Sequence, residues 1–188
     1  NRTYTLDAVQ ACESCHDDHA ADLADGLHQQ AISEGNIQAA VCTDCHGAHD
    51  VQRVDRAPQL VANICADCHV ATVSEWRVSP HVGIGTLGCS TCHTAHTQVL
   101  RGGFDANGQC INCHKVMPEQ WVHTQHLGLA YGDNEVGCVD CHMYTSPHGD
   151  GAQTVSTWSG TMPSGHSMNV DTASCTDCHE NAGDLPVT

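Results

Sequence analysis

Large hydrophobic side chains and basic residues are both scarce in this chain of 188 residues. Leu, Ile, Val and Phe together make up 32 residues, Phe occurs once, and six Lys and Arg stand against 22 Asp and Glu. A chain so poor in large apolar residues, with a formal charge of -16, is not expected to build a conventional packed core. The same negative charge argues against nucleic acid and anionic membrane surfaces as partners.

Long hydrophobic runs are also missing. The longest stretch without a charged residue, 78–100, is interrupted by Ser, Thr, Gly and His, so we predict no transmembrane segment. The chain begins at Asn1 without the features of a signal peptide, and we expect any export signal to have been removed already. Its length fits one domain, 1–188, which needs bound groups in order to fold.

Cysteine, in contrast, is abundant and strictly patterned. All 14 cysteines fall into C-x-x-C pairs, and a His follows each pair directly. C-x-x-C-H is the attachment sequence of c-type haem, in which two thioethers hold the porphyrin and the His binds the iron. Positions i, i+3 and i+4 share one face of a helical turn, so one turn can present all three side chains to one haem. The motifs are Cys12, Cys15 and His16; Cys42, Cys45 and His46; Cys65, Cys68 and His69; Cys89, Cys92 and His93; Cys110, Cys113 and His114; Cys138, Cys141 and His142; and Cys175, Cys178 and His179.

Disulfide bridges and zinc sites fit the cysteine pattern less well. A disulfide framework requires an even number of cysteines but does not require the His after each pair. Zinc sites group four ligands, and 14 cysteines do not divide by four, although mixtures of Cys and His could repair the sum. We therefore predict seven covalently bound haem c groups.

The motifs are arranged in internal repeats. Segments 12–28, 65–81 and 110–126 align without gaps, and each ends in a His twelve residues after its motif His. A second motif follows each segment, with another His close behind it. The chain thus divides into two-haem units at 12–49, 65–96 and 110–148 and a terminal one-haem unit at 166–179.

Nine His residues lie outside the motifs and are candidates for the second axial ligand of each iron. Six occupy equivalent positions in the three units, and His166 is the natural candidate for the last motif. A His three residues past a motif His, such as His49 or His96, lies on the near side of its own porphyrin and is expected to bind a neighbouring haem. His19 and His123 have no counterpart in the other units and are predicted to be dispensable. The predicted distal ligands are His28, His49, His81, His96, His126, His148 and His166.

The run from Cys65 to His96 reads C-x-x-C-H, W-x-x-S-P-H and C-x-x-C-H-x-x-H. It resembles the repeat of multihaem c-type cytochromes, in particular the pentahaem donors to periplasmic nitrite reductase and the decahaem conduit cytochromes. The resemblance covers essentially the whole chain through its motifs. It implies haem at all seven motifs, bis-His iron, assembly outside the cytoplasm, and alternating stacked and perpendicular haem pairs. Three features differ from that family: the number seven, the wider spacing from His142 to His148, and a last motif without a trailing His.

These features predict a fold class of short α-helices in a mostly irregular chain, with little or no β structure and haems at the core. Pro80 predicts that a helix ends just before His81, which then begins a loop. Turn residues predict loops at 51–58, 101–108 and 150–165. Trp76, seven residues after His69, is expected to share the helical face of its motif and to pack on a porphyrin.

The predicted function is electron transfer, because two His ligands per iron leave no position for a substrate. One motif per about 27 residues also brings porphyrin edges near contact. We expect a periplasmic or extracellular carrier or conduit, not an enzyme, whose redox partners are basic or dock at haem edges. Identical subunits could also stack into a conductive filament. The alternative is a multihaem reductase of nitrite, hydroxylamine or a sulfur oxyanion with one open iron, for which the motif at 175–179 is the candidate.

Overall fold

The computed structural model describes residues 2–51, 58–131, 134–145, 163–170, 172–176 and 178–179. Short helices and irregular loops dominate these ranges, and a single two-stranded antiparallel hairpin is the only sheet within them, which confirms the prediction of little β structure. The helices are α1 (Arg2–Asp7), α2 (Val9–Glu13), α3 (Asp17–Ala24), α4 (Leu27–Ser33), α5 (Cys42–His46), α6 (Pro58–Ala66), α7 (Val70–Val78), α8 (Cys89–Cys92), α9 (Ala106–Ile111), α10 (Trp121–His126), α11 (Cys138–His142) and α12 (Thr172–Thr176). The 3-10 helices are η1 (Pro80–Ile84), η2 (Arg101–Gly103) and η3 (Met117–Glu119), and the strands are β1 (Ala130–Tyr131) and β2 (Asn134–Glu135).

Each motif forms one helical turn. In five motifs the His N–H donates to the carbonyl of the first Cys at 2.7–3.0 Å, which is the i to i−4 bond of an α-helix. The other two motifs lie wholly inside α5 and α11. The two Cys and the His of a motif therefore project from neighbouring positions of a single turn, as the spacing predicts.

The second motif of each unit carries its own cap. The residue before its second Cys is Asp or Thr, and this side chain accepts a hydrogen bond from the backbone N–H of the residue that precedes the motif. Such a bond satisfies one of the donors that the start of a helix leaves without an intrahelical partner. The three bonds run from Val41 N to Asp44 Oδ2 at 2.8 Å, from Gly88 N to Thr91 Oγ1 at 3.0 Å and from Gly137 N to Asp140 Oδ2 at 2.6 Å.

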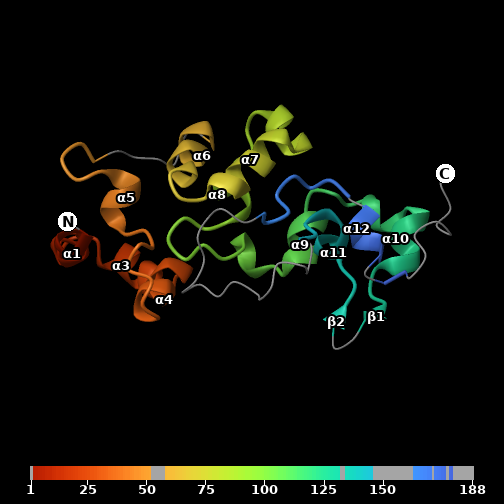
Figure 1. Ribbon diagram of the computed structural model, residues 1–188, viewed down its shortest axis with the longest axis horizontal. Coiled ribbons are helices and arrows are strands. Elements are labelled where there is room, and N and C mark those ends of the chain that lie inside the picture. Colours follow the sequence, from red (N-terminus) through yellow and green to blue (C-terminus); the bar gives the residue numbers. More distant parts are fainter. Residues whose placement is uncertain are drawn as a thin grey trace.

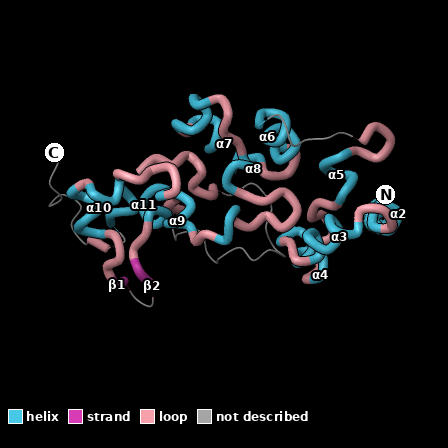
Figure 2. The backbone as a smooth tube through the Cα atoms, turned by 180° about the vertical axis from the view of Figure 1, so that it is seen from behind, coloured by secondary structure: helices cyan, strands magenta, loops and turns pink. Residues whose placement is uncertain are grey.

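The helices are spread along the long axis of the molecule, broadly in the order of the chain (Figure 1). Helices α1, α3 and α4 lie at one end, α10 to α12 lie at the other, and α6 to α8 lie between them (Figure 1). The view from behind shows the same order (Figure 2). Contacts join α2 to α5, α5 to α6, α6 to α8, α9 to α11 and α11 to α12, and each of these helices contains a motif Cys.

Side-chain packing supplies little of the interior. Among the described residues the buried apolar side chains are Ala31, Val41, Ala62, Val73 and Trp76. The polypeptide exposes 12592 Å², against about 8,700 Å² for an ordinary folded monomer of this mass. Within the described ranges no helix is long and apolar enough to cross a bilayer.

Two local expectations need correction at α7. The helix ends at Val78 as predicted, but His81 lies in η1 and not in a loop, because Pro80 at the first position of a helix sacrifices no hydrogen bond. The third motif begins at Cys65 in the last turn of α6, which ends at Ala66, and non-helical backbone at His69 separates the motif from α7. Trp76 is therefore on a different helix from the motif turn, where it is 6% exposed. Most of the predicted loops 51–58 and 150–165 lies outside the described residues.

Candidate metal centres

The imidazole of every motif His lies close to one other imidazole. A metal–imidazole bond is about 2 Å long and the ring nitrogen is roughly 1 Å from the ring centre, so two imidazoles on opposite sides of one metal have centres about 6 Å apart. The observed separations of ring centres are 5.9–6.3 Å. The pairs are His16 with His19, His46 with His96, His69 with His28, His93 with His166, His114 with His81, His142 with His123 and His179 with His126.

The His twelve residues after the first motif of a unit contacts the next unit, not its own. His28 of the first unit lies 6.0 Å from His69 of the second. By the same offset, His81 of the second unit lies beside His114, and His126 of the third lies beside His179. These three contacts link the units in chain order.

His96 returns in the opposite direction, from the second unit to the first. Its ring centre is 6.3 Å from that of His46, whereas its own motif residue, His93, faces His166. The structure thus places this His beside another motif, as the short spacing predicts. His19 approaches His96 to 4.7 Å, closer than a shared metal would allow for opposed ligands, while lying 6.1 Å from His16.

The distal positions differ in part from those that the repeats predict. His166 faces His93 of the fourth motif, and His126, not His166, faces the last motif. His123, predicted to be dispensable, faces His142. Self-alignment of the chain could not find His19 and His123, because neither position recurs in another unit. The count of ligands did not indicate them either, because seven other His residues already provided one partner for each motif.

Two predicted distal ligands have no counterpart in these pairs. His49 is exposed in the loop after α5, and among the described residues no aromatic ring packs against it. His148 lies outside the described residues. Its assignment stays a prediction.

Hydrogen bonds at Nδ1 orient three of the paired imidazoles. His93 Nδ1 donates to the Gln98 carbonyl at 3.0 Å and His142 Nδ1 donates to the Met168 carbonyl at 3.1 Å. His166 Nδ1 lies 3.1 Å from its acceptor, the carbonyl of Ser164. A proton held at Nδ1 leaves the Nε2 lone pair available for a metal, which is how metal-binding His residues are usually oriented.

Burial keeps several of these imidazoles neutral. Burial, followed by the neighbouring His28, His166 and His93, lowers the pKa of His69 to about 4. Burial is likewise the main cause of the lowered pKa values of His28, His81, His96 and His166. Only the neutral imidazole has a lone pair for a metal, so these side chains are in the binding form at neutral pH.

Within each unit, the first cysteines of the two motifs are neighbours. The pKa of Cys42 is raised by burial and by the thiol of Cys12. A hydrogen bond between Cys65 and Cys89 raises the pKa of the former and lowers that of the latter to about 7. In the third unit, burial and the adjacent Cys138 raise the pKa of Cys110 to about 11.

Between units, the second cysteine of one motif adjoins the next motif in the chain. Burial raises the pKa values of Cys45, Cys92 and Cys141, and each is raised further by a thiol of the following motif. Within a unit, neighbouring motifs approach each other through their first cysteines. Between units, the second cysteine of one motif lies near the next motif. The motifs therefore follow one another in space in the order of the sequence. The thiols that raise the pKa of a cysteine in the preceding unit are Cys68 for Cys45, Cys113 for Cys92, and Cys175 and Cys178 for Cys141.

No known family model matches this chain, and no solved structure matches it. The chemistry must therefore be argued from the residues. Two thiols, an imidazole one turn away and a second imidazole about 6 Å from the first are the ligand set of a covalently attached, six-coordinate haem iron. The donor set at each of the seven motifs fits that group.

Proposed function

We propose that this protein transfers electrons through seven covalently bound haem c groups, each with two axial His ligands. The observation that carries the proposal is the set of seven imidazole pairs, one for every C-x-x-C-H motif, with ring centres 5.9–6.3 Å apart. The haems supply reversible one-electron chemistry when bound. The polypeptide attaches them, orients their axial imidazoles and fixes their order.

The cysteine contacts support a continuous chain of haems. Each motif adjoins the next through a pair of thiols, from Cys12 beside Cys42 to Cys141 beside Cys175. Because each haem would be attached at those thiols, consecutive porphyrins would have edges close together. Electron tunnelling falls steeply with distance, so such a chain conducts where isolated haems would only store electrons.

The distribution of apolar side chains supports haems as the interior. Large aliphatic residues in or beside the motif helices are exposed on the polypeptide, such as Val70 at 53%, Val78 at 70% and Val116 at 63%. Covering such side chains with porphyrin would bury apolar surface worth about 25 cal/mol per Å². The bound macrocycles would thus supply the core that the composition lacks.

A reductase is the less favoured function. A substrate needs an iron with one free position, and the sequence identified 175–179 as the candidate. The ring of His126 lies 6.1 Å from that of His179, and each of the other six motif His residues has a neighbouring imidazole as well. We therefore propose a carrier or conduit, not an enzyme. It would act in the periplasm or outside the cell, with partners that are basic or dock at haem edges, or with copies of itself in a filament.

Low-temperature EPR of the oxidised protein, combined with a haem-per-chain assay, tests this proposal. We expect seven haems per chain and only low-spin ferric signals, because two imidazoles give a strong ligand field. A high-spin signal amounting to one iron per chain would contradict complete bis-His ligation and would favour the reductase.

A further inference from the structure

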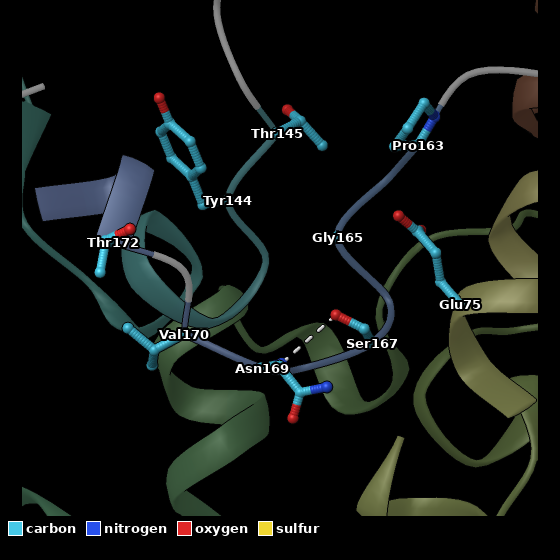
Figure 3. Close-up of a pocket in the computed structure, with 9 residues that line it drawn as sticks. All are labelled: Glu75, Tyr144, Thr145, Pro163, Gly165, Ser167, Asn169, Val170 and Thr172. Atoms are coloured by element: carbon cyan, nitrogen blue, oxygen red, sulfur yellow. Dashed lines mark hydrogen bonds between the residues drawn. The ribbon is translucent and has the colours of Figure 1, made fainter. Parts of the chain in front are cut away.

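The segment 163–170 lies alongside α7, although almost 90 residues separate the two in sequence (Figure 3). Residues 164–168 are termed the strap. One carboxylate oxygen of Glu75, Oε2, accepts hydrogen bonds from the backbone N–H of Ser164 at 2.9 Å and of His166 at 3.2 Å. Ser164 Oγ lies 3.1 Å from the same oxygen and 2.8 Å from Thr72 Oγ1. The half-buried side chain of Glu75 thus anchors the start of the strap to α7.

The strap lies beside two motif His residues that belong to different units. The ring of His166 lies 6.2 Å from that of His93, in the fourth motif. Two residues later, the carbonyl of Met168 accepts the Nδ1 proton of His142, in the sixth motif, at 3.1 Å. One short segment therefore supplies the partner imidazole at one site and the orienting acceptor at another.

Two residues of the strap have positive φ angles, which restrict the conformation of its backbone. Gly165 has φ +73° and is buried, and a Cβ there would collide with the backbone of Met143. Met168 also has a positive φ, +57°, which is uncommon for a residue with a side chain. A cleft of about 470 Å³ borders the strap, with Glu75 on one side and Tyr144 on the other (Figure 3).

We propose that Glu75 is a positioning residue whose carboxylate holds the strap, and through it sets the distal ligation at His93 and the orientation of the imidazole at His142. The inference rests on the proposed function, since it assigns Glu75 an effect on two of the seven haems. Neutral amide bonds alone would hold the strap less firmly, because bonds to a charged acceptor are shorter and stronger. The negative charge also favours the ferric state of a nearby iron.

Substitution of Glu75 tests the proposal, with the exposed Glu119 of η3 as the matched control. In Glu75→Ala we expect loss of one low-spin iron in seven, and changed hyperfine-shifted NMR signals of the sixth haem. Hydrogen exchange at the Ser164 and His166 amides should accelerate by about tenfold or more, since both lose their acceptor. Glu119→Ala should match the parent protein in all three measurements.

Two further variants separate positioning from general damage to the fold. Glu75→Gln keeps an acceptor oxygen but loses the negative charge. Unlike Glu75→Ala, it should therefore retain all seven low-spin irons, yet raise the reduction potential of the fourth haem. Gly165→Ala displaces the strap from its other side and should affect the same two haems as Glu75→Ala. If Glu75→Ala and Glu75→Gln both show parental spectra, exchange rates and potentials, the role of Glu75 is wrong. If the parent protein lacks seven low-spin haems, the proposed function fails instead.

Discussion

Individual imidazoles would carry most of the chemistry of the proposed haem sites, and their surroundings decide which ring nitrogen is available to a metal. His93 and His142 donate from Nδ1 to backbone carbonyls, and burial together with neighbouring imidazoles lowers the pKa of His69 to about 4. An imidazole that is neutral and fixed at Nδ1 presents Nε2 without a proton to remove. Nearby backbone carbonyls and burial therefore decide whether Nε2 of an imidazole is available to a metal, and the C-x-x-C-H motif specifies neither of them.

His126 offers the sharpest test at this scale, because its ring is the one that faces the motif at 175–179. We expect His126→Ala to convert one of seven irons to the high-spin state, since this ring lies 6.1 Å from that of His179. His49→Ala is the matched control and should leave every iron low-spin, because His49 is exposed and unpaired among the described rings. EPR of both variants is the measurement. A high-spin iron in His49→Ala, with none in His126→Ala, would reverse the assignment.

At the scale of single elements, close backbone approaches determine how motif helices meet. Gly88 immediately precedes α8 and lies against Pro58 at the start of α6, and a Cβ on Gly88 would lie 2.7 Å from that of Pro58. These two helices carry the third and fourth motifs, whose cysteines Cys65 and Cys89 are hydrogen-bonded. Absence of a side chain at Gly88 thus allows two motifs to adjoin.

We expect Gly88→Ala to destabilise the protein by about 1–3 kcal/mol, the usual cost of inserting a methyl group into a tight contact. Gly83→Ala in η1 is the control, since a Cβ there meets no atom within 4 Å and should change stability by less than about 0.5 kcal/mol. Denaturant unfolding followed by haem absorbance compares the two. Equal midpoints for both variants would show that α6 and α8 do not pack as described.

Helical turns and helix ends are predicted well from the sequence where the signal lies in neighbouring residues. Each C-x-x-C-H motif is a helical turn, and a helix does end before Pro80. What could not be predicted is where loops bring distant residues. The segment with His166 lies beside α7 because Glu75 and Thr72 bind it, and neither residue belongs to a recognisable motif. Pairing of His123 with His142 likewise depends on tertiary contacts that repeats do not encode.

For the whole molecule, paired imidazoles from different units would act as cross-links through the proposed haem irons. His28 reaches the second unit, His81 reaches the third, and His96 returns to the first. With few buried apolar side chains among the described residues, these links and the groups they hold would stabilise the fold. Binding free energy is then folding free energy, as in other small proteins organised around metals.

Intact mass spectrometry of the mature protein, under denaturing conditions that retain only covalent attachments, tests the proposed haem core most directly. We predict a mass equal to the polypeptide plus seven haems, with no free thiol that alkylating reagents can modify. A mass equal to the bare polypeptide with alkylatable cysteines, or zinc recovered in place of haem iron, would contradict the proposal at its foundation.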